Sequence, residues 1–166
     1  MTSLAAFDVG RPASRAYAVG MKTILVPVDF SDTTSGVIET AKQFAATFGS
    51  RVVLLHISEP EPDFVGFEPG PIAVRQTVAR DLKQEHQKME DLKSSCGIPD
   101  VLALHIQGPA VEKILHEAAS HNAELIVIGS HGHGALYELL VGSVTAGVLK
   151  GAKCPVLVVP VAKSAA

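Results

Sequence analysis

Five short apolar runs, rich in β-branched residues and separated by segments of helical spacing, constrain this chain more than any other feature. The runs are Thr23–Val28, Arg51–Ile57, Val101–Ile106, Glu124–Gly129 and Pro155–Pro160. Strands that alternate with helices form right-handed βαβ units, in which the strands are parallel. The sequence therefore predicts an α/β fold: a three-layer α/β/α, doubly wound sheet of five parallel strands with helices on both faces.

The segments between the runs have recognisable helix ends. Gly49 is suited to end a first helix, and a second is expected from Pro71 or Ile72 to about Ser95. A third follows Gly108-Pro109, with proline near the first helical position. Together these ends support the alternation of strands and helices.

The end of the first run has two special features. Pro27 lacks a backbone donor, which predicts a disturbed ladder near the end of that strand. Residues 29–32 (Asp-Phe-Ser-Asp) supply candidate N-caps for the first helix. In doubly wound sheets, ligands bind at the carboxyl ends of the strands at a topological switch point. We therefore look for function in the loops after the first and fourth strands.

Composition excludes several classes of protein. The 166 residues are 47% hydrophobic and 19% charged, as expected for one folded domain rather than a disordered chain. The formal charge of −3 argues against a basic surface, so we expect no nucleic-acid partner. No apolar run has the roughly 18–20 residues that a membrane span requires.

The first twenty residues differ from the rest. Residues 1–20 have no sustained period and no uninterrupted signal-peptide core, so we interpret them as a flexible leader before a single domain at 21–166. Cys96 and Cys154 form neither a CxxC pair nor a zinc pattern. Reduced thiols in a cytoplasmic protein are the expected state.

A glycine-rich segment after the fourth strand carries the chemistry. It reads Gly129-Ser130-His131-Gly132-His133-Gly134, and Gly142-Ser143 follows just before the last helix. Glycines allow close backbone approach and positive φ, and the N–H groups at a helix N-terminus bind anions. The alternative is a tight turn that merely needs glycine. The combination at a strand end favours phosphate binding, although neither a Walker A sequence nor a dinucleotide fingerprint is present.

At these residues the chain resembles the universal stress proteins of the UspA superfamily. The resemblance runs from Met21 to Val161 and is carried by Met21–Ser31, Leu54–Ile57 and Ile126–Pro160. Its most specific element is the motif G-x2-G-x9-G-[ST], matched by Gly129, Gly132 and Gly142-Ser143. The resemblance implies a strand order of 3-2-1-4-5 in a fold like that of the adenine nucleotide alpha hydrolases.

The resemblance further implies an ATP-binding member of the family. It puts the ribose and phosphates at the glycine motif and the start of the last helix, and the adenine near the ends of the first two strands. The implied site residues are Pro27, Val28, Asp29, Ile57, Ile128, Gly129, His131, Gly132, His133, Gly142, Ser143, Val144 and Thr145. Mg²⁺ is expected to bridge the phosphates. From the residues alone, Asp29 is equally suited to cap the first helix.

Charge in this segment favours binding over catalysis. No Lys or Arg lies between Gly129 and Lys150, so no arginine finger or phosphate-binding lysine is apparent. We expect a nucleotide-dependent regulatory or stress-response protein with little or no turnover. The alternatives are a weak ATPase or adenylating enzyme of the same fold group and a nucleotide-free dimerisation module. The resemblance also implies a homodimer formed through the last strand, Pro155–Val161.

Other polar groups carry weaker signals. His131 and His133 lack a further ligand at metal-site spacing, so no metal centre is expected there. His56 and His105 are interpreted as satisfied core or strand-end residues. On the second helix, the charged residues are interpreted as a solvated face; they are Glu85, Lys88, Glu90 and Asp91.

Overall fold

The computed structural model describes residues 21–59, 72–130 and 141–160, and in 72–76 the backbone alone. Within these residues the strands are β1 (Thr23–Val28), β2 (Arg51–Ser58), β3 (Val101–Gln107), β4 (Leu125–Gly129) and β5 (Val156–Val159). The helices are α1 (Thr34–Phe48), α2 (Ile72–Ser95), α3 (Ala110–Ser120) and α4 (Ser143–Gly151). The expected leader, residues 1–20, lies outside the described part of the chain.

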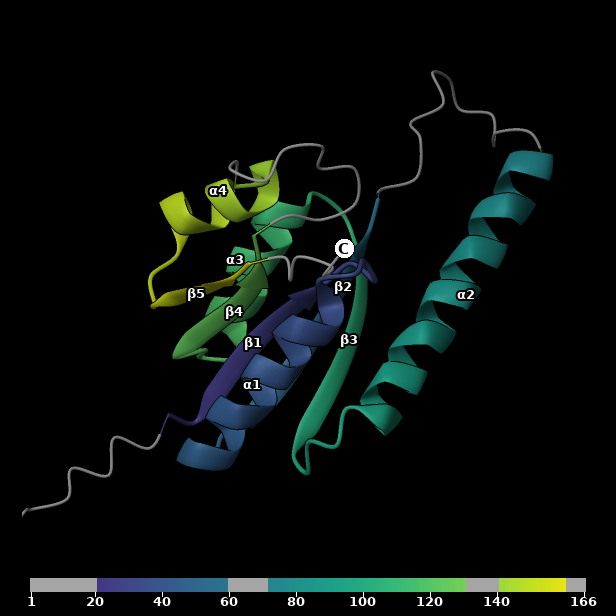
Figure 1. Cartoon of the computed structure of the whole chain (residues 1–166). Coiled ribbons are helices and arrows are strands. Elements are labelled where there is room, and N and C mark those ends of the chain that lie inside the picture. Colours follow the sequence, from purple (N-terminus) through teal and green to yellow (C-terminus); the bar gives the residue numbers. More distant parts are fainter. Residues whose placement is uncertain (1–20, 60–71, 131–140, 161–166) are drawn as a thin grey trace, which may run out of the picture.

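All neighbouring strands pair in parallel, in the order β3-β2-β1-β4-β5. Helices α1 and α2 pack on one face of the sheet, and α3 and α4 pack on the other (Figure 1). The predicted five-stranded, doubly wound α/β/α fold and its strand order are therefore confirmed. The switch point lies between β1 and β4, where successive connections lead to opposite halves of the sheet.

Two apolar layers form the core, because successive side chains of a strand point to opposite faces. Toward α1 and α2, Val26 and Leu54 pack with Val37 and Met89. Toward α3 and α4, the buried side chains include those of Leu25, Leu55, Ile114, Ile126 and Val148. The sheet thus has an independent packing layer on each side.

Pro27 leaves a gap at the switch point. The Thr23 carbonyl accepts a hydrogen bond from Glu124 at the start of β4, so by alternation Pro27 also directs its backbone toward β4. Proline has no N–H to donate there. The β1–β4 register ends at Leu25↔Ile126, whereas the β1–β2 register continues through Val28↔His56. The predicted disturbance is confirmed, because the pairing of β1 with β4 stops before Pro27.

The helix ends follow the sequence with one exception. Gly49 ends α1 with a left-handed φ of 68° and donates its N–H to the Ala45 carbonyl oxygen at 2.8 Å. The N-cap of α1 is Thr33, which makes no side-chain capping bond, rather than a residue of 29–32. Those four residues instead form a turn in which Phe30 has a φ of 59°.

Cys96 and Cys154 are free thiols, as expected. None of the helices in the described part of the chain is long and apolar enough to cross a membrane.

Candidate functional site

A cavity of about 420 Å³ lies at the carboxyl ends of β1, β2 and β4, next to the first turn of α4. This volume is within the usual range for sites that bind a small molecule or cofactor. The lining residues are Pro27, Val28, Asp29, Thr33, Thr34, Val37, Leu55, Ile57, Ala110, Ile114, Ile128, Gly129, Gly142, Ser143, Val144 and Thr145.

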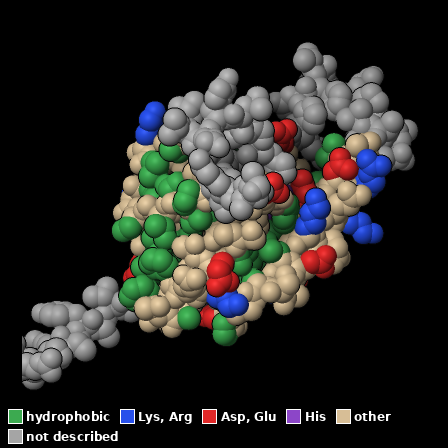
Figure 2. Space-filling model, in the orientation of Figure 1, with side chains coloured by type: hydrophobic (Ala, Val, Ile, Leu, Met, Phe, Trp, Pro, Cys, Tyr) green, Lys and Arg blue, Asp and Glu red, His purple; other side chains and the backbone are tan. Residues whose placement is uncertain are grey.

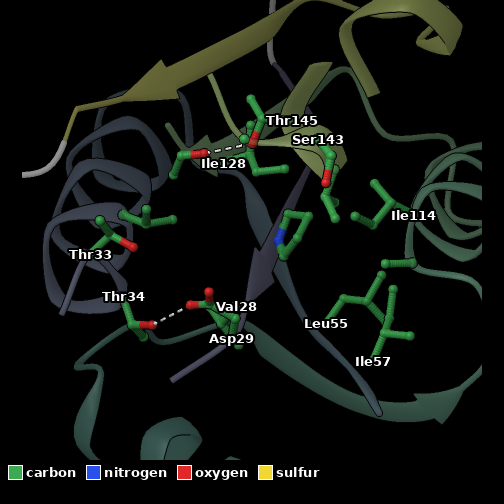
Figure 3. Close-up of a pocket in the computed structure, with 16 residues that line it drawn as sticks. Val28, Asp29, Thr33, Thr34, Leu55, Ile57, Ile114, Ile128, Ser143 and Thr145 are labelled. Atoms are coloured by element: carbon green, nitrogen blue, oxygen red, sulfur yellow. Dashed lines mark hydrogen bonds between the residues drawn. The ribbon is translucent and has the colours of Figure 1, made fainter. Parts of the chain in front are cut away.

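The cavity has an apolar wall and a polar wall (Figure 3). Leu55 and Ile57 of β2 lie together with Ile114 of α3 on one side. On the opposite side lie the Asp29 carboxylate and the hydroxyl groups of Thr33 and Thr34. A ligand with a flat apolar part and hydrogen-bonding groups matches these two walls.

The start of α4 is tied to the end of β4. The Gly142 N–H donates to the Ser130 carbonyl oxygen at 2.8 Å, and the Thr145 hydroxyl donates to the Gly129 carbonyl oxygen at 2.7 Å. Ser143 and Val144 lie in the first turn, whose N–H groups have no acceptor within the helix. The N–H groups of Ser143, Val144 and Thr145 and the positive end of the helix dipole therefore lie beside the cavity.

The two described motif glycines, Gly129 and Gly142, have ordinary dihedral angles. Gly142 has φ −58° and ψ 154°, which any residue can adopt. Among the described glycines, positive φ occurs at Gly49, Gly97 and Gly108, not at Gly129 or Gly142. The positive φ that glycine allows is therefore not adopted at either described motif glycine.

Asp29 lies at the cavity, but the helix-capping role considered from sequence is wrong, because the N-cap of α1 is Thr33. It lines the cavity, and its Oδ1 accepts hydrogen bonds from the Ser31 N–H at 3.0 Å and the Ser31 hydroxyl at 2.6 Å. The Thr34 hydroxyl approaches the same oxygen at 3.5 Å. Asp29 thus holds the turn that leads into α1, although it does not occupy the N-cap itself.

The structure brings most of the predicted site residues together around one cavity. They are Pro27, Val28, Asp29, Ile57, Ile128, Gly129, Gly142, Ser143, Val144 and Thr145. His131, Gly132 and His133 lie outside the described residues. Sequence reasoning missed Thr33, Thr34, Leu55 and Ile114. Leu55 could have been found, since it lies two residues before Ile57 on the same face of β2.

No lysine or arginine is present among the described residues that line the cavity. The nearest formal charge in the lining is the carboxylate of Asp29. Among the described residues, the groups suited to hold an anion here are therefore N–H groups, hydroxyl groups and the α4 terminus.

A second polar cluster lies on the face of the sheet that α1 and α2 cover. His56 of β2 and His105 of β3 are register neighbours, and both approach Glu85 of α2. Ser58 lies between them and hydrogen-bonds to both Glu85 and His105. The interpretation of Glu85 as part of a solvated face is wrong, because its side chain is only 31% exposed and contacts these strand residues.

The environment of this cluster shifts two pKa values. Burial raises the pKa of Glu85, but the Ser58 hydroxyl and the two histidines outweigh burial and bring that pKa below its usual value. Burial lowers the pKa of His105, and the nearby His56 lowers it further, against a partial offset from Glu85. His56 and His105 do lie near strand ends, as expected, but the expectation that both are satisfied is wrong for His56, whose buried Nε2 has no hydrogen-bond partner among the described residues.

Comparison with known proteins gives one consistent result. The model of the universal stress protein family matches residues 20–160. A curated relative from Thermus aquaticus, the universal stress protein in the QAH/OAS sulfhydrylase 3′ region, is 36% identical over 138 residues. That alignment covers 83% of this chain and 98% of the relative.

Solved structures agree with the sequence matches. Protein MJ0577 of Methanocaldococcus jannaschii aligns with a TM-score of 0.65 and 27% identity, over 88% of this chain and all of the other. A universal stress protein in complex with cAMP aligns with a TM-score of 0.60 and 22% identity, over 86% of this chain and 99% of that one. The latter similarity concerns the fold alone.

Proposed function

Because the chain belongs to the universal stress protein family, we propose that it binds ATP and acts as a nucleotide-dependent regulatory protein in a stress response. The observation that carries this proposal is the position of the cavity. It lies at the switch point of the sheet, with an apolar wall at one side and the first turn of α4 beside it.

The apolar wall suits an adenine ring. Val28, Leu55 and Ile57 offer aliphatic surface to a flat base, and the Asp29 carboxylate can accept hydrogen bonds from an amino or hydroxyl group. A carboxylate repels phosphate, so the charged end of the ligand would lie away from Asp29. The related structure that was solved with cAMP contains an adenine nucleotide, which supports this choice of ligand class.

The opposite end suits phosphate. Ser143, Val144 and Thr145 present N–H groups at the start of α4, and the Ser143 hydroxyl faces the cavity in Figure 3. Anions bind readily at helix N-termini because the N–H groups and the helix dipole act together. Mg²⁺ would share the phosphate charge, since oxygen ligands from phosphates and water are the ones it prefers.

The absence of cationic side chains from the described lining favours binding over turnover. Phosphoryl transfer is accelerated by cations that stabilise the transition state, and neither Lys nor Arg contributes to this part of the site. We therefore propose that ATP is held as a regulatory ligand, with hydrolysis near the background rate.

The test is mass spectrometry of the nucleotide released from the denatured purified protein, together with calorimetric titration of nucleotide-free protein with ATP, with and without Mg²⁺. Gly142→Val fills space beside the phosphate end without straining the backbone, because Gly142 already has dihedral angles that valine favours. Its control is Gly36→Ala, on the exposed side of α1, where an added methyl group meets only Val159 at 3.8 Å.

We expect ATP to bind the wild type and the control equally, and to bind Gly142→Val at least roughly tenfold more weakly, a loss of about 1.4 kcal/mol. Saturating ATP should also stabilise the wild type, by about 2.7 kcal/mol at 100 times Kd. Equal ATP affinity of wild type and Gly142→Val would overturn the proposed site. Sustained phosphate release by the wild type that Gly142→Val lacks would favour the weak ATPase instead.

A further inference from the structure

Three side chains on the face of the sheet that α1 and α2 cover converge on one point. His56 and His105 occupy paired positions on adjacent parallel strands, so their imidazoles project from the same face. Their ring centroids are 5.3 Å apart. Glu85 reaches this pair from α2, which covers β2 and β3 on that face.

The distances match a set of metal ligands. Glu85 Oε2 lies 3.7 Å from His56 Nε2 and 3.4 Å from His105 Nε2, and one ligand atom from each residue lies within 4.8 Å of the others. Four ligands at about 2.1 Å around a tetrahedral ion are separated by about 3.4 Å. Small side-chain adjustments would therefore bring all three atoms to a common ion.

His56 is already arranged as a ligand. Its Nδ1 lies 2.8 Å from the Val28 carbonyl oxygen, which can only accept a hydrogen bond, so the Nδ1 atom carries the proton. In the neutral ring, the lone pair is then on Nε2, the atom that faces Glu85. Metal-binding histidines characteristically donate their other N–H to a carbonyl or carboxylate in this way.

The Nε2 atom of His56 is buried, yet it has no hydrogen-bond partner within the part of the chain that the structure describes. The His56 side chain is only 8% exposed, and the Phe30 ring packs against it with centroids 4.3 Å apart. A buried polar atom without a partner is costly and calls for an explanation. A cation that accepts the lone pair would provide one.

The cluster does not resemble a serine hydrolase site. Ser58 Oγ lies 2.6 Å from His105 Nε2, as a nucleophile and its base would. In such a site the carboxylate must orient the far nitrogen of the ring. Glu85 instead approaches the same Nε2 atom, at 3.4 Å. Both histidine Nε2 atoms and the carboxylate face one position, which is the arrangement of metal ligands.

We propose that His56, Glu85 and His105 form a Zn²⁺ site that fastens α2 to the edge half of the sheet. Two imidazoles and one carboxylate suit zinc, whereas Mg²⁺ and Ca²⁺ prefer oxygen ligands alone. Three protein ligands leave the fourth position of a tetrahedral ion to water. Water can reach that position from the side of Glu85, whose side chain is partly exposed. Ser58 donates its hydroxyl proton to Glu85, so His105 Nε2 donates to Ser58 Oγ in the metal-free cluster. To bind Zn²⁺, His105 would carry its proton on Nδ1 and exchange the Ser58 contact for the ion, while Ser58 goes on supporting the bound carboxylate.

The test is Zn²⁺ titration of the full chain after removal of metal and nucleotide. We expect one Zn²⁺ per chain with a micromolar or tighter Kd, the visible absorption of four-coordinate Co²⁺ on cobalt substitution, and a higher Tm with Zn²⁺. Glu85→Gln and His105→Gln should each weaken binding roughly tenfold or more. Both retain a polar side chain, so far-ultraviolet circular dichroism should show an unchanged fold.

Two further variants act as controls. His116→Gln changes an exposed histidine of α3, on the other face of the sheet, and should bind Zn²⁺ like the wild type. The double variant His131→Gln/His133→Gln should do the same. The proposal is overturned if the wild type binds no Zn²⁺ stoichiometrically, if Glu85→Gln and His105→Gln bind as tightly as the wild type, or if the His131/His133 variant is the one that loses binding. None of these outcomes depends on whether the protein binds ATP.

Discussion

The Thr145 hydroxyl donates a hydrogen bond to the carbonyl oxygen of Gly129 across 2.7 Å, joining the first turn of α4 to the last residue of β4. Thr145 is only 4% exposed. Since the bond links the two sides of the segment that follows β4, it positions the N–H groups beside the cavity. Loss of the Thr145–Gly129 hydrogen bond should therefore lower both the free energy of unfolding and the affinity for nucleotide.

Thr145→Val should destabilise the fold by about 1–2 kcal/mol, because valine has the same shape but leaves the Gly129 oxygen without this donor. Nucleotide affinity should fall with it. Urea unfolding followed by circular dichroism measures the first effect, and calorimetry the second. Thr47→Val is the control: Thr47 bonds a helix carbonyl at 2.8 Å on the exposed side of α1, where water can replace the bond. Equal midpoints for the two variants would contradict the prediction.

Two glycines in helices should respond to alanine with opposite signs. At Gly147 of α4, a Cβ atom would lie 2.7 Å from one methyl carbon of Val111 and 3.0 Å from the other. Valine is stiff at χ1, so overpacking should outweigh the gain in helix propensity and destabilise Gly147→Ala by roughly 1 kcal/mol net. At Gly36 the same change meets only ordinary contact. Gly36→Ala should stabilise by about 0.5–1 kcal/mol. Thermal unfolding compares the two, and the same sign for both would refute the packing argument.

The outer edge of β5 should mediate self-association. The carbonyls of Pro155 and Val159 accept hydrogen bonds from the β4 side, so by alternation Val158 directs its N–H away from β4. Figure 2 shows hydrophobic side chains gathered over α4 and β5, while charged side chains concentrate over α2. An edge strand in such surroundings is a template for pairing with a second chain.

Val158→Pro removes that outward N–H and leaves the β4 ladder intact. We expect the wild type to sediment as a dimer and Val158→Pro as a monomer at the same micromolar concentration. Phe48→Lys, on a 42% exposed side chain of α1, controls for surface hydrophobicity and should remain dimeric. A wild-type monomer, or a Val158→Pro dimer, would show that this edge is not the interface.

Cys154 should be a slow nucleophile. Burial raises the pKa of its thiol, with a partial offset from a backbone hydrogen bond. A raised pKa leaves less thiolate at pH 8, and the thiolate is the reacting form. In a Cys96→Ala background, iodoacetamide should therefore modify native Cys154 more slowly than the same chain in guanidinium. The two rates should approach each other as the pH rises above 9. Equal rates at pH 8 would contradict the raised pKa.

Local patterns were sufficient to predict most of the fold. The first strand was predicted with its observed bounds, and Gly49 ends α1 as expected. Pro27 was correctly expected to disturb the ladder. These features depend on periodicity, on proline's missing donor and on glycine's freedom at positive φ, all of which a sequence shows directly.

The misses concern contacts between distant residues. Glu85 was assigned to solvent because its helix face is polar, and nothing local shows that two strand residues lie opposite it. A signal was available in the strands themselves: the tripeptide Leu-His-Ile occurs at 55–57 and again at 104–106. The repetition alone does not show that the two histidines are neighbours, because that depends on the register of β2 and β3, which pairs His56 with His105.

The polar wall of the cavity was missed for a related reason. The first helix was expected to be capped within residues 29–32, but Asp29 binds the Ser31 N–H instead and the helix begins later. The turn thereby brings Thr33 and Thr34 to the cavity. A short polar segment offers several competing hydrogen-bond patterns, and tertiary packing selects among them.

Because side chains alternate along β2, adjacent residues of this strand contribute to two different sites, the cavity and the histidine–glutamate cluster. Ile57 faces the cavity, while His56, its immediate neighbour, faces the histidine–glutamate cluster. The two sites are nevertheless connected, because His56 Nδ1 donates a hydrogen bond to the carbonyl oxygen of Val28, a residue that lines the cavity. A substitution at His56 should therefore alter the cavity as well, through the backbone of Val28, whereas a substitution at Ile57 alters the cavity lining directly.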